Sequence, residues 1–121
     1  MRRPERFAET LREEITEIVG YELSDPRLLS VTVTDVRLSE NMRDAKVFVT
    51  VEGSESEIRS ALSALHKASA FVRQQVAMSL NLRHAPHLHF VRDTIEERAA
   101  RIDSILGDLA ERGEFNEKED G

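Results

Sequence analysis

The sequence predicts a two-layer α+β domain in which amphipathic helices pack on one face of a three-stranded sheet. Two observations support this fold class. The 121 residues suffice for one hydrophobic core but not for two, and no internal repeat divides the chain. Three short segments with strand periodicity are flanked by segments with helical periodicity, in the order α-β-β-α-kink-α-β-α.

The first element is an amphipathic helix over residues 5–22, because its apolar side chains recur at helical spacing. We expect it to end at Gly20 or at the Ser-Asp-Pro turn of residues 24–26. Its apolar face consists of Phe7, Ala8, Leu11, Ile15, Ile18 and Val19.

The first strand is predicted over residues 29–38, where apolar and polar residues alternate. The alternation loses its phase after Val33, which predicts a β-bulge near Asp35. Residues 39–43 then form the connection of a hairpin, so the first two strands should pair antiparallel.

The second strand is predicted over residues 44–51, with alanine and valines on one face. Lys46 and Phe48 lie on the other face, which we expect to be open to solvent or to a partner. Phe48 could stack on an RNA base there, although a phenylalanine in a strand more often packs in a core.

A long helical run follows over residues 55–80. Ser54 and Glu57 form a capping box that places its start. An unbroken helix of this length would extend about 39 Å, which is long for so small a domain. We therefore expect a kink at Ser69, which interrupts the apolar stripe and could cap a second helix. Phe71 would then turn inward.

The third strand is predicted over residues 87–92, and Asp93 with Glu96 is expected to cap a final helix. This organisation predicts a folded domain over residues 3–110 and a disordered acidic tail over residues 111–121. The apolar stripe of the final helix consists of Ile95, Ile102, Ile105, Leu106 and Leu109.

Charge is segregated along the chain. The net charge is -6, but residues 58–92 contain no aspartate or glutamate. A basic face on an acidic body fits a polyanionic partner such as RNA, and an ordinarily solvated helix surface is the alternative. The same stretch holds all four histidines together with the cations Arg59, Lys67, Arg73, Arg83 and Arg92.

Composition excludes several classes of function. The absence of cysteine excludes disulfides, thiolate catalysis and cysteine-ligated zinc. Neither a run of about 20 apolar residues nor a secretory signal is present, which predicts a cytoplasmic protein without a membrane segment. His84, His87 and His89 resemble metal ligands, but no nearby carboxylate completes a site. We expect no catalytic residues, metal or other cofactor.

Six motifs appear together in this order: "ELSDPRL", "VTVTDVRLS", "DAKVFVTV", "HKASAFVRQQV", "LNLRHAPHLHFVRD" and "ERAARIDSIL". Over residues 3–109 the chain resembles bacterial ribosome-binding factor A. The resemblance implies a K-homology fold of type II topology. It also implies a non-enzymatic monomer that binds the free small (30S) ribosomal subunit and assists late maturation and processing of 16S ribosomal RNA, in cooperation with assembly GTPases.

The resemblance further implies where RNA binds. K-homology domains contact RNA through a Gly-x-x-Gly loop, whereas this family has an Ala-x-Gly kink between two helices. The matching positions are Ala68, Ser69 and Ala70, so alanine replaces the glycine of the family. The expected RNA-binding residues are Arg43, Lys46, Arg59, His66, Lys67, Ala68, Ser69, Ala70, Arg73, Arg83 and Arg92.

Two other classes of function remain open at this stage. The acidic first helix could dock a protein partner, with the basic stretch being incidental. Alternatively, the histidines could serve a small metal-dependent hydrolase.

Overall fold

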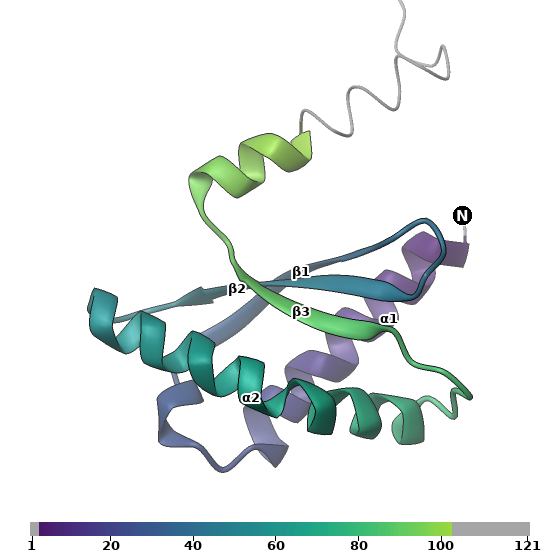
Figure 1. The fold of residues 1–121 in the computed structure, drawn as a ribbon, viewed down its shortest axis with the longest axis horizontal. Coiled ribbons are helices and arrows are strands. Elements are labelled where there is room, and N and C mark those ends of the chain that lie inside the picture. Colours follow the sequence, from purple (N-terminus) through teal and green to yellow (C-terminus); the bar gives the residue numbers. More distant parts are fainter. Residues whose placement is uncertain (1–2, 103–121) are drawn as a thin grey trace, which may run out of the picture.

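The computed structural model describes residues 3–102. Helices α1 and α2 lie on one face of a three-stranded sheet, and a further helix over 95–102 lies on the other face (Figure 1). No helix among the described residues is long and apolar enough to cross a membrane. The elements are α1 (Arg3–Glu17), a π-helical turn η1 (Ile18–Glu22), a 3₁₀ turn η2 (Pro26–Leu28), β1 (Val31–Leu38), β2 (Asp44–Val51), α2 (Glu55–Ser79) and β3 (His87–Arg92).

The sheet has the order β1-β2-β3, with β1 antiparallel to β2 and β3 parallel to β2. Strand β3 is therefore an edge strand. Val33 pairs with Val49 and Asp35 pairs with Phe48, so Thr34 is the extra residue of a bulge. The structure confirms the predicted bulge and the predicted bounds of β2 and β3.

The hydrophobic core lies between the sheet and the two long helices. Strand β2 is central to it, because Ala45, Val47 and Val49 are fully buried. The amphipathic pattern of the first helix is confirmed, with its apolar face turned to the sheet. Fully buried side chains of the helices are Leu11, Ile15, Ile18, Leu65, Val72 and Val76.

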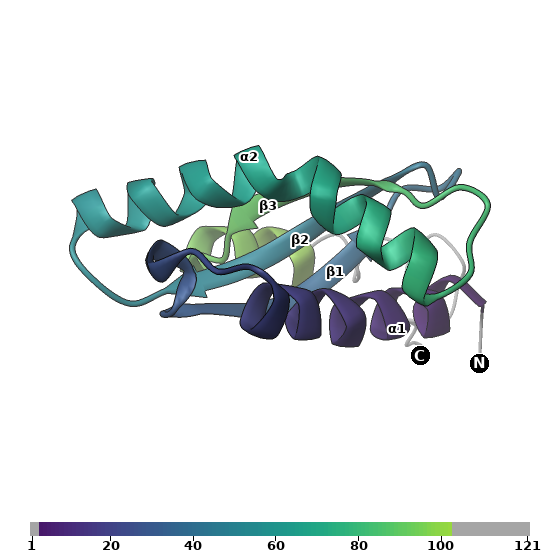
Figure 2. The same ribbon diagram turned by 90° about the horizontal axis from the view of Figure 1, so that it is seen from below.

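Helix α2 is one continuous helix, so the predicted division into two helices is wrong. The predicted capping box of Ser54 and Glu57 is confirmed. Ser69 does not cap a new helix, because its hydroxyl donates to the carbonyl of His66 at 2.9 Å within the same helix. Such a bond often bends a helix, and the axis of α2 changes direction near its middle (Figures 1 and 2). Without a break there is no change of phase, and Phe71 stays 43% exposed.

The helix over 95–102 packs on the face of the sheet that was expected to be open, so the prediction of helices on one face only is wrong. Thr94 rather than Asp93 caps it, because the Thr94 hydroxyl accepts the Glu97 amide at 3.1 Å. Ile95 and Ile102 of its predicted apolar stripe are exposed. The other residues of that stripe and the predicted acidic tail lie outside the described residues.

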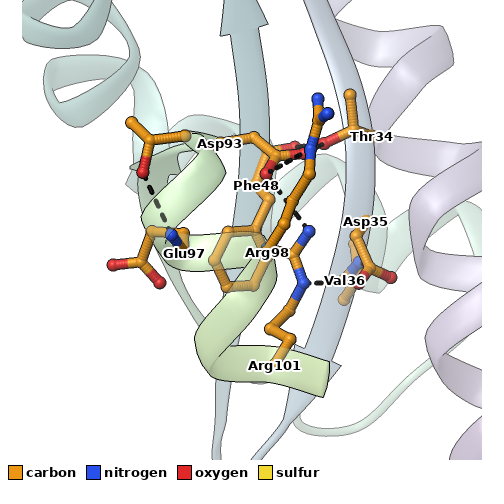
Figure 3. Close-up of polar contacts among 9 residues, drawn as sticks. Thr34, Asp35, Val36, Phe48, Asp93, Glu97, Arg98 and Arg101 are labelled. Carbon is orange, nitrogen blue, oxygen red and sulfur yellow. Dashed lines mark hydrogen bonds and ion pairs between the residues drawn. The ribbon is translucent and has the colours of Figure 1, made fainter. Parts of the chain in front are cut away.

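Phe48 is the residue of β2 that this helix covers. Its side chain is only 2% exposed, because the side chain of Arg101 lies over the ring (Figure 3). In this fold Phe48 therefore cannot serve as an open platform for RNA stacking.

Candidate nucleic-acid interface

One side of α2 runs along the edge strand. Arg59, His66 and Arg73 recur every seven residues, or about two helical turns, and so lie on the same side of the helix. His66 Nε2 is 3.1 Å from the carbonyl oxygen of Phe90, and Arg73 Nε donates to the carbonyl of Ala85 at 2.9 Å. These bonds fasten α2 to β3 and to the loop that precedes it.

The backbone of β3 alternates between its neighbour and the open edge. The His87 amide donates to the carbonyl of Arg43 and the Asp93 amide donates to the carbonyl of Val49, so the backbone groups of the odd-numbered residues point toward β2. The backbone groups of the even-numbered residues point toward the free edge, which explains how the carbonyl of Phe90 reaches His66. The free edge of β3 and the adjoining side of α2 form one continuous surface, which we call the edge surface.

A hollow of about 300 Å³ lies at the C-terminal part of the edge surface. Two arginines, Arg73 and Arg83, contribute its positive charge, and small side chains keep it open. The lining residues are Ala70, Arg73, Gln74, Ala77, Arg83, His84 and Ala85. Small side chains beside cations allow the backbone of a nucleic acid to approach closely.

Most of the predicted RNA-binding cations have no carboxylate partner within residues 3–102, unlike four of the other arginines. Arg12, Arg27, Arg98 and Arg101 each pair with a carboxylate. Within residues 3–102, Arg92 is the one predicted cation with such a partner, Glu55 at 3.3 Å. The predicted cations that have no carboxylate partner there are Arg43, Lys46, Arg59, Lys67, Arg73 and Arg83.

The remaining predicted residues of α2 have different surroundings. Lys67 is exposed, about 100° around the helix from His66. Ala68 packs against the core, and the hydroxyl of Ser69 is bonded within the helix. Ala70 is exposed and lines the hollow. Ala70 is therefore the residue of the expected kink that lies at the hollow.

Lys46 lies on the opposite face of the sheet from α2, since it alternates with the buried Ala45 and Val47. Arg43 lies in the hairpin, and its carbonyl accepts the amide of His87 at 2.8 Å. The structure thus separates Lys46 from the cations of the edge surface.

Arg37 is a cation that the sequence analysis did not single out. It pairs with Lys46 across β1 and β2, and it has no carboxylate partner among residues 3–102. The predicted bulge near Asp35 could have located it, because the bulge moves the side chain of Arg37 to the same face of the sheet as Lys46.

The histidines do not form a metal site. Among the described residues, no group of three or more histidine, aspartate or glutamate side chains could hold a metal ion. His84 lines the hollow, whereas His89 bonds to Asp44 at 2.8 Å on the opposite face of the sheet. The metal-dependent hydrolase therefore lacks a centre in this part of the chain.

Comparison with known sequences matches the chain to one protein family. The model of the family described as ribosome-binding factor A matches residues 3–106. Ribosome-binding factor A of Desulfitobacterium hafniense is 39% identical over 117 residues, which cover 97% of this chain and 94% of the relative. That of Thermomicrobium roseum is 43% identical over 95% of this chain and 89% of the relative.

Comparison of the folds gives the same family. The crystal structure of ribosome-binding factor A from Thermus thermophilus matches with a TM-score of 0.66 and 29% identity, over 74% of this chain and 94% of that one. A homology model of Thermus thermophilus ribosome-binding factor A, fitted into a cryo-electron microscopy map of a 30S complex with that protein, matches with a TM-score of 0.60 and 31% identity, over 69% of this chain and 88% of that one. The chain therefore belongs to the ribosome-binding factor A family.

Proposed function

We propose that this protein is a non-enzymatic, RNA-binding assembly factor of the small ribosomal subunit. It binds the free 30S subunit and assists late maturation and processing of 16S ribosomal RNA. Membership of the family supports this proposal, as does the similar protein fitted into a 30S complex. The observation that carries it is the set of cations along α2 and the following loop, beside the open edge of β3, that have no carboxylate partner within residues 3–102.

The proposed mode of binding is contact with phosphates. Arg59 and Lys67 extend from α2, and Arg83 extends from the loop at the hollow. Exposed cations without partners bind phosphates without first breaking an ion pair. Ala70 lets the RNA backbone approach the helix, in the place of a glycine loop. Binding of this kind reads the shape of the RNA, and it would hold RNA helices in one arrangement until maturation is complete.

We further propose that residues 3–110 are a K-homology domain of type II topology. The order of α1, β1, β2, α2 and β3 supports this, with the continuous α2 in the place of two helices. The protein would act as a monomer in the cytoplasm, with assembly GTPases as partners. Residues 111–121 would form a disordered tail.

Binding to purified 30S subunits over a range of salt concentrations tests the proposal. We expect the logarithm of the affinity to fall linearly with the logarithm of the salt concentration. Lys67→Glu combined with Arg83→Glu should weaken binding at least tenfold and reduce the slope by about 0.7 to 0.9 for each lost phosphate contact. An affinity of the wild-type protein that does not depend on salt would contradict the proposal.

The choice of variant follows from the contacts. Lys67 and Arg83 are exposed, whereas Arg73 holds the carbonyl of Ala85 and would disturb the fold if reversed. Arg12→Glu combined with Arg27→Glu is a control for net charge, because it changes the charge equally at two arginines outside the edge surface that already pair with carboxylates. This control should bind within about twofold of the wild-type protein.

Docking of a protein partner through α1 is the alternative function. Its support is weaker, because Glu9 is paired with Arg12 and Glu14 accepts a hydrogen bond from Ser79. Capture of subunits or proteins from a lysate after treatment with ribonuclease distinguishes the two. Capture that survives the treatment favours the protein partner.

A further inference from the structure

We propose that the protein has a second RNA-binding surface on the face of the sheet opposite α1 and α2, which we call the outer face. This inference rests on the proposed function and deepens it. Arg37 pairs with Lys46, and Lys46 pairs with His89, across all three strands. Directly paired residues point to the same face of a sheet, so these three side chains form one basic row.

The carboxylates of the outer face pair with His89 but leave the other two members of this row unpaired within the described residues. Asp44 bonds to His89 at 2.8 Å, and Asp35 lies 3.4 Å from Arg101. Within the described residues, Arg37 and Lys46 have no carboxylate partner. Two permanent positive charges are therefore left on adjacent strands, about 5 Å apart at the backbone. Two cations on paired positions can contact phosphates of one RNA strand together.

The composition of the outer face favours RNA over a protein partner. The centre of a protein interface is usually built from exposed aromatic and apolar anchors. Phe48 is the aromatic side chain of this face in β2, and the helix over 95–102 covers it (Figure 3). The open part, nearer the hairpin, offers the basic row with His87 and Asp44 beside it. Among the described residues, the exposed apolar side chains Ile95 and Ile102 lie on that helix, whereas the open part of the sheet provides mainly charge complementarity.

The outer face and the edge surface must bind different parts of the RNA. Lys46 points away from α2, because it alternates with the buried Ala45 and Val47, whereas the hollow that Arg73 lines lies at α2 and the loop before β3. A phosphate in contact with Lys46 therefore cannot also contact Arg73. The protein would hold one RNA segment on each side of β3, which would fix the distance between the two segments during assembly.

Protection mapping of ribosomal RNA on purified 30S subunits tests this inference. The outer-face variant is Arg37→Glu combined with Lys46→Glu, and the edge variant is Lys67→Glu combined with Arg83→Glu. Each should bind about tenfold more weakly than the wild-type protein, with a shallower dependence on salt. At saturating protein, each variant should lose a different subset of the protected nucleotides.

Two further measurements keep the result interpretable. Arg37→Gln combined with Lys46→Gln removes the charges without reversing them, and it replaces the glutamate variant if glutamate destabilises the strands. It should lose protection of the same nucleotides. Circular dichroism should show wild-type secondary structure for this variant. Arg12→Glu combined with Arg27→Glu again controls for net charge, and it should retain every protection.

The outcomes separate this inference from the proposed function. If the outer-face variants keep all protections and full affinity while the edge variant loses both, the second surface does not exist. If they bind RNA normally but lose a protein partner, the outer face is a protein-docking surface and the inference is wrong. If the wild-type protein fails to bind the subunit, the proposed function fails and the inference falls with it.

Discussion

The guanidinium of Arg101 lies over the ring of Phe48, 4.0 Å from its centroid (Figure 3). Asp93 orients this guanidinium, because its carboxylate accepts from Arg101 Nη2 at 3.1 Å and from Arg98 Nε at 3.2 Å. The hydroxyl of Thr34, the extra residue of the bulge, donates to the same carboxylate at 2.5 Å. The helix over 95–102 is thus attached to the outer face by a polar cluster together with a stacked arginine.

Asp93→Asn should weaken this attachment. The side chain of Asp93 is 2% exposed and that of Arg101 is 16% exposed, so the substitution removes the nearer and more buried of the two carboxylates that pair with this guanidinium. Asp35, 3.4 Å from Arg101, is then its remaining partner. We expect a loss of about 2 kcal/mol in the free energy of unfolding, measured with urea. Amides of residues 95–102 should also exchange faster with solvent. Glu9→Gln, which breaks an exposed pair, should unfold at nearly the same urea concentration as the wild-type protein.

The same carboxylate predicts sensitivity to acid. Burial by itself raises the pKa of Asp93, but the hydrogen bond from Thr34 and the charges of Arg101 and Arg98 outweigh it and lower the pKa. A lowered pKa gives stability that is fully present above the unfolded pKa of about 3.9 and is lost as the pH falls further. Unfolding followed by circular dichroism should therefore show declining stability below about pH 4.

Asp93→Asn should reduce that decline without removing it. Asp25 also contributes, because the hydrogen bond from the Arg27 side chain lowers the pKa of Asp25 to about 2. An equal loss of stability between pH 4 and pH 2 in the variant and the wild-type protein would contradict the role assigned to Asp93.

Two glycines should respond in opposite ways to alanine. Gly53 has a φ of +142°, and a Cβ there would lie 2.7 Å from Glu57 Oε1 of the capping box. Gly53→Ala should therefore cost about 1 to 3 kcal/mol. Gly20 has no heavy atom within 4 Å of an added Cβ, so Gly20→Ala should leave the stability unchanged or raise it slightly. Thermal unfolding of both variants is the test, and similar losses would be inconsistent with this account.

Glycine at residue 70, which the family resemblance implies for this position, should destabilise this protein. Ala70 is exposed in the interior of a continuous helix, and its φ is not positive. Ala70→Gly should cost about 1 kcal/mol, because glycine loses more backbone entropy than alanine in a helix. Urea unfolding measures this loss. A variant as stable as the wild-type protein would show that the backbone at residue 70 gains from glycine.

The sequence alone predicted the elements whose cause is local. Strands β2 and β3 follow from alternation, the start of α2 from its capping box, and the bulge near Asp35 from a loss of phase. The segregation of charge also predicted that α2 and the next loop carry cations. These features depend on neighbours within a few residues, which a sequence displays directly.

The tertiary structure decided what depends on contacts between distant residues. Ser69 predicted a break in the helix. Its hydroxyl instead donates to the carbonyl of His66 in the same helix, and α2 bends without breaking. The helix over 95–102 packs on the outer face because Arg101 stacks on Phe48, a contact between residues far apart in the chain. Arg37 and Lys46 become neighbours only when β1 pairs with β2. Local periodicity determines which side chains share a face, whereas only packing determines what that face meets.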